Sequence, residues 1–539
     1  MDLTTVLQLV LLPAGAVAVA GFARWRGWSV PLLLVSAGLV VGLIAAQVPG
    51  APEYELDPEL VLFGFLPPLL YSASLDSSYL RLRDVRRPVA LLSIGLVLFS
   101  AAVIGLLTHL LVPGLPLAAA FALGAIVAPP DAVAAIAVAR RLGLPRKIIT
   151  ILVGESLFND ATALTAFRVA AGAAGGAGLV VGGVGFTLVT AAGQLLYAAG
   201  VGLAIGLVLA FAFGKLMNVV RDPLITNAIS LLIPFGSYLA AEAAHASGVL
   251  SVVVVGVYLG HRMNRTTYGT RVVSYAVWKV VDFLLETVVF LLIGLQLPLI
   301  LRGLAGQDPV RVAGYALAVF AAAIVARVIW VFAGTHLPRM LSAKIRAREE
   351  RPPASHIMVI GWAGMRGVVS LAAAFTLPAD FPGRDLILFL TFVVVIGTLL
   401  VQGLSFPWLI KKLRVTSEAE VFRDNLSEAA AQQAAAGAAL ARLEELTREG
   451  VLETHADVVD RLRTHAERRA MGAWERLGGG TGPEGEETPS ALYKRLRRAM
   501  LEAERSVLVR MRDERRIDDE VLRRVTRELD YEEATLARE

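Results

Sequence analysis

Long apolar runs, each about the length of a membrane-crossing helix, recur between residues 3 and 411. A helix needs about 20 apolar residues to cross the hydrocarbon core of a bilayer. The runs therefore predict an all-α membrane protein with about 13 transmembrane helices, of which the ninth is short. The predicted spans cover residues 3–21, 29–47, 59–79, 89–112, 116–139, 148–171, 187–213, 224–246, 248–260, 275–300, 311–333, 356–378 and 385–411.

The polar connections between these spans alternate in charge. Every second loop is basic, as in 81–87, 140–147 and 339–351, whereas the loops between them are acidic, neutral or Gly-rich, as in 53–59 and 172–186. Because basic loops remain on the cytoplasmic side, the alternation predicts an N-terminus outside and a C-terminus in the cytoplasm. We expect a multi-pass protein of the bacterial plasma membrane.

The chain changes character near residue 413. Residues 413–539 are charged, rich in Ala, Glu, Leu and Arg, and spaced as in helices. Residues 478–488 contain a Gly-rich and acidic stretch, which predicts a flexible linker. We therefore expect two domains, a transmembrane domain over 1–412 and a helical cytoplasmic tail over 413–539. The tail could bind an unidentified regulator.

Composition excludes several classes of protein. Hydrophobic residues make up 56% of the chain and charged residues only 18%, with no cysteine, and the mean hydropathy is +0.64. This excludes a soluble protein, a disulfide framework and thiol chemistry. The net charge of +5 is spread over many loops, so it does not indicate nucleic-acid binding. No HExxH, CxxC or nucleophile–base pattern is present, so we expect neither an enzyme nor a cofactor.

Two predicted spans are interrupted near their centres. Residues 127–131 contain Pro129, Pro130 and Asp131, and residues 360–367 contain three glycines with Arg366. The two spans run in opposite directions, which is the pattern of inverted-repeat transporters with crossed broken helices. Asp131 could compensate helix N-terminal ends, or it could be a second ion ligand, and Arg366 could compensate C-terminal ends.

The sixth predicted span carries four polar residues, Glu155, Ser156, Asn159 and Asp160. Charged groups inside the bilayer cost about 2.5–3.5 kcal/mol each on insertion scales, so they indicate function. The i,i+4 spacing of Ser156 and Asp160 places both side chains on one helix face. Their oxygens could hold a small monovalent cation, and the low dielectric would help Asp160 to bind a proton in its place. A single carboxylate could then serve both ions by competition.

Several motifs in order resemble the monovalent cation:proton antiporter family 1, the bacterial branch of the sodium/proton exchanger type. They are Leu66–Tyr71 (LPPLLY), Pro129–Ala135 (PPDAVAA), Gly154–Thr162 (GESLFNDAT), Ser247–Leu250 (SGVL) and Gly364–Gly367 (GMRG). The resemblance covers about residues 1–412. It implies a homodimer in which a core domain moves against a dimerisation domain.

The resemblance also implies roles for individual residues. Asp160 would bind the cation or proton with help from Ser156, and Asn159 would go with electroneutral exchange. Asp131 would lie where the broken helices cross, and Arg366 would bridge toward Glu155 and Asn159. Two departures affect the expected ion site: Ser72 stands where many members carry Glu, and Val153 stands where close relatives have Glu.

We therefore expect a secondary antiporter that exchanges sodium, or alternatively potassium or lithium, for protons by alternating access at Asp160. The alternative is a cation channel, or a channel-like sensor, gated by the tail. For Glu155, a structural pair with Arg366 is preferred over contact with the ion. The other charges within spans are expected to have structural roles. Arg327 and Glu242 would take part in packing or interface pairing. Asp282 and Glu286 would lie on a solvated face, with funnel electrostatics as the alternative.

Overall fold

The computed structural model describes residues 3–48, 57–174, 188–220, 222–348, 351–448, 456–477 and 487–538. Within these residues every regular element is a helix. The chain divides into two compact units, Met1–Thr416 and Ser417–Glu539. The acidic residues Glu53 and Glu55, most of the Gly-rich loop 172–186 and the linker 478–488 up to residue 486 lie outside the described residues.

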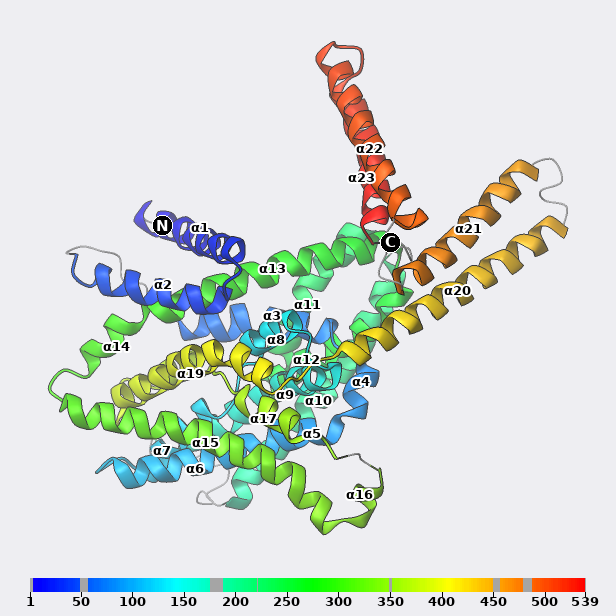
Figure 1. Cartoon of the computed structure of the whole chain (residues 1–539). Coiled ribbons are helices and arrows are strands. Elements are labelled where there is room, and N and C mark those ends of the chain that lie inside the picture. The colour runs from blue at the N-terminus through cyan, green and yellow to red at the C-terminus, as the bar shows by residue number, and fades with distance from the viewer. Residues whose placement is uncertain are drawn as a thin grey trace. The chain divides into compact units, whose positions relative to one another are not determined.

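Unit 1 consists of helices that follow one another with short connections (Figure 1). Its first half contains α1 (Leu3–Arg26), α2 (Val30–Ala45), η1 (Leu60–Phe65), α3 (Leu66–Leu75), α4 (Tyr79–Asp84), α5 (Arg86–Ala90), η2 (Leu91–Leu96), α6 (Val97–Leu111), α7 (Leu117–Val127), α8 (Val133–Arg141) and α9 (Arg146–Ala174). Its second half contains α10 (Leu188–Val219), α11 (Pro223–Ala243), α12 (Gly248–Arg262), η3 (Met263–Arg265), α13 (Tyr268–Leu295), α14 (Leu297–Gly303), α15 (Pro309–Leu341), α16 (Ala343–Arg348), α17 (Ala354–Trp362), α18 (Val368–Phe375) and α19 (Arg384–Lys412).

Local sequence explains where several of these helices begin. Asp222 caps α11, and its carboxylate accepts hydrogen bonds from the backbone N–H groups of Leu224 and Ile225 at 2.8 and 3.0 Å. Asp308 caps α15 in the same way. In both helices a proline follows the cap, where its missing N–H is of no consequence and its fixed φ suits the first helical turn.

Seven of the helices are long and apolar enough to cross a membrane, counting only the residues that the structure describes. They are Arg86–Leu111, Arg146–Ala174, Ala192–Val219, Pro223–Ala243, Tyr268–Gly303, Pro309–Leu341 and Arg384–Lys412. The remaining predicted spans coincide with α1 and with shorter helices, among them α2, η1 with α3, and the interrupted pairs α7–α8 and α17–α18.

The helices of unit 1 approach closely where small residues face one another. A Cβ atom on Gly38 of α2 would lie 2.4 Å from the carbonyl oxygen of Leu291 in α13, and one on Gly294 would lie 2.4 Å from that of Val35. Small residues allow such backbone contact between helices in a membrane, where dispersion forces and not the hydrophobic effect drive association. Figure 1 shows α2 lying along α13.

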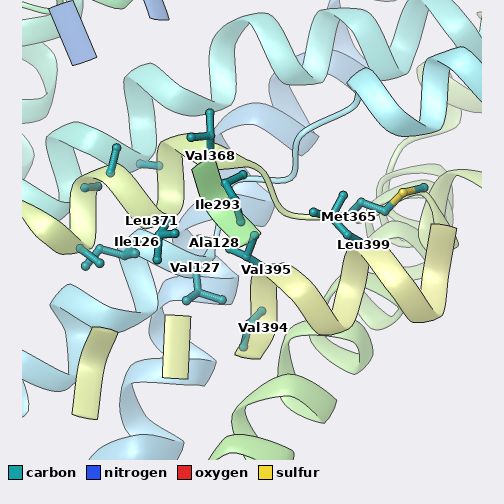
Figure 2. Close-up of a cluster of buried hydrophobic side chains, with 14 of the residues drawn as sticks. Ile126, Val127, Ala128, Ile293, Met365, Val368, Leu371, Val394, Val395 and Leu399 are labelled. Carbon is teal, nitrogen blue, oxygen red and sulfur yellow. The ribbon is translucent and has the colours of Figure 1, made fainter. Parts of the chain in front are cut away.

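Both interruptions predicted within spans are non-helical in the structure. α7 ends at Val127 and α8 begins at Val133, while α17 ends at Trp362 and α18 begins at Val368. The backbone N–H of Asp131 donates to the carbonyl oxygen of Met365 at 2.7 Å, so the two interruptions are in direct contact. Figure 2 shows the apolar side chains around them, including Ile126, Val368 and Val395 of α19. Apolar packing on this side thus supports the position of both breaks.

Unit 2 contains α20 (Glu418–Arg448), α21 (Ala456–Leu477), α22 (Pro489–Asp513) and α23 (Asp519–Arg538). α22 and α23 form an antiparallel pair that buries Leu501, Leu529 and Leu536. Arg497 of α22 donates to both carboxylate oxygens of Glu532 in α23, at 2.6 and 2.7 Å. A small apolar contact and charged pairs thus hold this hairpin together.

Candidate functional site

α9 carries all four polar residues of the predicted strip, and all but Ser156 are almost completely buried. Glu155 is 1% exposed, Asn159 is 0% exposed and Asp160 is 9% exposed. The four side chains nevertheless face different surroundings. Ser156 and Asp160 border a cavity, whereas Glu155 and Asn159 contact neighbouring segments of the protein. The helix therefore separates two residues that face a cavity from two that make structural contacts.

The cavity that Ser156 and Asp160 border has a volume of about 460 Å³. Its lining comes from η1, α3, α4, α8, α9, α13, α18 and both interruptions. The lining extends from the buried carboxyl group of Asp160 to Arg81 and Arg140, whose side chains are exposed. The cavity thus leads from the carboxylate to the surface on the side of the basic loops.

Asp131 also borders the cavity, and it lies at the contact between the two interruptions. One of its carboxylate oxygens accepts a hydrogen bond at 2.9 Å from the backbone N–H of Val133, the first residue of α8. A Cβ atom on Gly367 would lie 2.2 Å from the other oxygen, so only glycine leaves room for this carboxylate. Asp131 therefore caps the N-terminus of α8, where a negative charge is stabilising.

Asn159 ties α9 to the first interruption. Its amide nitrogen donates to the carbonyl oxygen of Pro130 at 2.6 Å. This carbonyl belongs to the backbone that the two prolines release from helical hydrogen bonding. The amide oxygen of Asn159 is buried and has no hydrogen-bond partner among the described residues. Asn159 thus positions the break beside Asp160 and does not itself border the cavity.

The expected pairing of Glu155 with Arg366 is wrong, because the partner of Glu155 is Arg327 of α15. The two terminal nitrogens of Arg327 donate to the two carboxylate oxygens of Glu155, the second at 2.9 Å. Arg327 is 0% exposed and also donates to the carbonyl oxygen of Ile360 at 3.0 Å. Such a bidentate geometry is the strongest form of this interaction. The alternative of direct contact between Glu155 and the ion also finds no support, since Glu155 does not border the cavity.

Arg366 instead donates hydrogen bonds at the C-terminal end of α7. Its guanidinium group donates to the carbonyl oxygen of Ala128, and more weakly to that of Ala323 at 3.5 Å. Its backbone N–H donates to the hydroxyl of Thr398 in α19 at 3.0 Å. Ala128 follows the last residue of α7, so Arg366 satisfies a carbonyl that the break leaves without a helical donor. A cation at a helix C-terminus is stabilising, and this contact explains why Arg366 is not available to Glu155.

Asp282 and Glu286 of α13 border the cavity, which favours the alternative of funnel electrostatics over a merely solvated face. The hydroxyl of Ser72 in α3 donates to one carboxylate oxygen of Asp282. The other oxygen of Asp282 is buried and has no partner in the described part of the chain. Five acidic side chains of the described residues thus border the cavity, Asp76, Asp131, Asp160, Asp282 and Glu286.

The remaining intramembrane carboxylate is remote from this cavity. Glu242 of α11 accepts a hydrogen bond from Arg168 of α9 at 2.9 Å. This contact agrees with the interpretation of Glu242 as a pairing partner. Arg168, unlike Glu155, retains substantial exposure, so the pair resembles a surface salt bridge that contributes about 0–1 kcal/mol.

Sequence reasoning did not identify Arg327 as the partner of Glu155 or Ser72 as the partner of Asp282. A signal for Arg327 was present, since an arginine in a membrane span requires a partner, but Glu155 was assigned to Arg366. Choosing between Arg327 and Arg366 requires knowledge of which one the break at Ala128 uses. The signal for Asp282 was weaker, because its partner Ser72 lies 210 residues away.

Comparison with known proteins gives a consistent result. Residues 11–412 match the family described as "Sodium/hydrogen exchanger, transmembrane". An uncharacterized Na(+)/H(+) exchanger of Mycobacterium tuberculosis is 33% identical over 522 residues, which cover 94% of this chain and 91% of the relative. The Na(+)/H(+) antiporter NhaH of Halobacillus dabanensis is 35% identical and covers 76% of this chain and 97% of the relative.

Other relatives differ in the ions they are named for. The "Sodium, potassium, lithium and rubidium/H(+) antiporter" of Bacillus subtilis is 32% identical over 395 residues, or 70% of this chain and 57% of that protein. Among solved structures, the sodium proton antiporter MjNhaP1 from Methanocaldococcus jannaschii matches 77% of this chain and 99% of its own with a TM-score of 0.59. At 21% identity this likeness concerns the fold.

Proposed function

Because the chain belongs to the sodium/hydrogen exchanger family, a family of multi-pass membrane transporters, we propose that it exchanges a monovalent cation for protons at Asp160. We propose sodium as the ion, with potassium and lithium as alternatives, since relatives are named for sodium alone and for all three ions. The membrane would be the bacterial plasma membrane. No cofactor enters the proposed cycle.

One observation carries this proposal: a buried carboxylate and a hydroxyl on one helix face border a cavity that leads to the surface. Asp160 and Ser156 provide oxygen ligands, which small hard cations prefer. Asp160 accepts no hydrogen bond from any described residue, so its oxygens are available to a cation or a proton. Asp131 would act mainly as the cap of α8, with a role as second ligand as the alternative.

The way in which the other charges are compensated supports the proposal of electroneutral exchange. Glu155 is neutralised by Arg327, and Asp131 is stabilised by the N-terminus of α8. Asp282 and Glu286 lie on α13, away from the polar strip of α9, and would attract cations into the cavity. Asp160 would then be the single group that alternates between one cation and one proton.

We infer alternating access from the one-sided cavity. It reaches the surface beside Arg81 and Arg140, in loops whose charge predicts the cytoplasmic side. The structure would therefore correspond to a state open to the cytoplasm. The proposal further includes about 13 transmembrane helices arranged as inverted repeats, an external N-terminus, a cytoplasmic tail and a homodimer. A cation channel is the alternative function, and it would conduct without coupling to protons.

The test is a flux measurement in proteoliposomes with sodium, potassium and lithium gradients at several pH values. For the wild type, a cation gradient is expected to change the lumenal pH, in the direction set by the gradient. The rate of this change is expected to saturate as the cation concentration rises. Asp160→Asn is expected to abolish this response, whereas Asp308→Asn, an exposed helix cap that Asn can also serve, is expected to retain it. Proton flux in Asp160→Asn equal to that of the wild type would refute the site, and cation flux without proton movement would favour the channel.

A further inference from the structure

A second cavity, of about 830 Å³, lies against α9 on the side away from Asp160. It is bordered by α9, α10, α12 and the segment 79–98. Its long central part is apolar, with side chains such as Leu98, Leu203 and Val254. No part of the proposed exchange cycle uses it.

One end of this cavity is basic. Arg83, Arg86 and His261 border it there, and neither arginine side chain has an ion pair or hydrogen bond to another described residue. The hydroxyl of Tyr258, which also borders the cavity, is buried and lacks a partner among the residues described. No acidic side chain of the described residues borders the cavity. This end therefore offers uncompensated positive charge and a free hydroxyl to a negatively charged group.

The apolar part has the length of one leaflet of a bilayer. Its lining on α10 extends from Leu195 to Leu207. At 1.5 Å per residue this is about 18 Å, compared with about 15 Å for half the hydrocarbon core. Arg83 and Arg86 lie at the start of a predicted span, next to the loop that its charge places in the cytoplasm. The basic end is thus at headgroup level.

We propose that this cavity binds an anionic phospholipid of the cytoplasmic leaflet. The phosphate would lie beside Arg83 and Arg86, within reach of the Tyr258 hydroxyl, and an acyl chain would extend between α9 and α10. Arginine suits this role because its planar group recognises phosphate oxygens. An anionic lipid is favoured over a zwitterionic one because the described lining offers no carboxylate to pair with a choline or ethanolamine group.

The position of the lipid has a consequence for α9. Phe158, Ala161 and Thr165 border this cavity, while Ser156 and Asp160 border the ion cavity. α9 therefore lies between the two, and a lipid on one face restrains the helix that carries the ion ligands on the other. The effect on transport depends on the proposed function, whereas lipid binding itself does not.

The test is native mass spectrometry of the full-length protein with added phosphatidylglycerol or phosphatidylcholine. Wild-type protein is expected to retain phosphatidylglycerol preferentially. Arg83→Gln with Arg86→Gln is expected to weaken its binding roughly tenfold, given the attraction of each basic residue to anionic lipid. Lys411→Gln with Lys412→Gln, a basic pair at the end of α19 outside the cavity, is the matched control and is expected to bind like the wild type.

A second variant tests the apolar part without changing charge. Ala199→Phe on α10 fills the acyl-chain space and is expected to lower the retention of both lipids. Equal retention of the two lipids by wild-type protein would overturn the proposal without any variant. Retention of phosphatidylglycerol by the double arginine variant at the wild-type level would overturn it as well. Neither result would affect the assignment of cation exchange to Asp160.

Discussion

At the scale of single residues, the buried charges of unit 1 fall into two groups. Glu155 and Arg327 form a bidentate pair, and Arg366 donates to the backbone carbonyl of Ala128. Asp160 has no such partner and borders a cavity instead. Burying a charge without a compensating partner costs free energy, so natural proteins retain such a charge mainly where it has a functional role. This contrast, more than the motif around it, supports the proposal that Asp160 is the exchanging group.

The pair between Glu155 and Arg327 leads to a stability prediction. Glu155→Gln or Arg327→Met leaves the other charge buried alone, which costs roughly 3–5 kcal/mol. The double substitution is expected to recover part of this loss, because no unpaired charge remains. Ser156→Ala is the matched control and is expected to weaken cation binding with little change in melting temperature. Equal melting temperatures for all four variants in detergent would mean that the pair does not support the fold.

The contact between Ser72 and Asp282 leads to a prediction about cation affinity. Asp282→Asn removes one negative charge from the cavity and is expected to raise the half-saturating sodium concentration by about tenfold at low ionic strength, with less effect on the maximal rate. Added choline chloride is expected to reduce the difference by screening. Asp385→Asn, an exposed carboxylate at the start of α19, is the control. A lower maximal rate with unchanged half-saturation would contradict this role.

Contacts between residues close in the sequence could be predicted for this site, whereas contacts between residues far apart in the sequence could not. The i,i+4 spacing of Ser156 and Asp160 places both on one face from local geometry alone. The partner of Glu155 depends on a contact across 172 residues, and that of Asp282 on one across 210. Nothing local distinguishes two intramembrane arginines, because the choice depends on which of them faces the carbonyl of Ala128.

At the scale of elements, the two helix breaks depend on glycine for close approach. Gly367 leaves room for the carboxylate of Asp131, and Gly364 leaves room for the side chain of Arg327. The sequence signals for the breaks, two prolines in one span and three glycines in the other, were strong because they act on the local backbone. Their direct contact through Asp131 and Met365 was an expectation from transporter architecture, not from local sequence.

Gly367→Ala is therefore expected to abolish exchange while leaving the protein folded. The new methyl group would displace the carboxylate of Asp131 and with it the cap of α8. Gly314→Ala on α15 has open space around it and is expected to retain full exchange, with a gain in stability of about 0.5–1 kcal/mol. Flux in proteoliposomes and size-exclusion profiles measure both. Wild-type flux in Gly367→Ala would show that the close contact has no functional importance.

The hairpin of α22 and α23 leads to a prediction about pH. Hydrogen bonds from Arg497 lower the pKa of Glu532 from its ordinary value. The stabilisation from this pair is therefore present above the ordinary pKa of a glutamate, and it is lost as the pH falls through the lowered value. Hydrogen exchange of residues 489–538 in the full chain is expected to accelerate modestly below about pH 4, near the pKa of free glutamate. Glu532→Gln should exchange faster at neutral pH and lose this component of the pH dependence. An unchanged dependence in that variant would exclude the pair as its source.

At the scale of the whole molecule, the proposed cycle moves no net charge. Moving one charge across the membrane corresponds to about 2.3 kcal/mol per 100 mV, so an electrogenic cycle would respond strongly to an imposed potential. Steady-state exchange by the wild type is expected to be independent of potential. Arg327→Met, if it folds, is expected to introduce a dependence, because Glu155 would then carry an uncompensated charge. A reversal point of the wild type that follows the potential would show that a second group titrates.

The contact between Arg366 and the carbonyl of Ala128 also has a consequence for synthesis and membrane insertion. The two residues are 238 positions apart, so the ribosome makes Ala128 long before its partner. At 5–20 residues per second the interval is roughly 12–48 s. During this time the first break has its freed carbonyls and Asp131 without the second break beside them. Since lipid cannot satisfy such groups, water or the insertion machinery must hold that region until α17 and α18 arrive. A nascent chain arrested before residue 354 should therefore be a preferred substrate for membrane quality control.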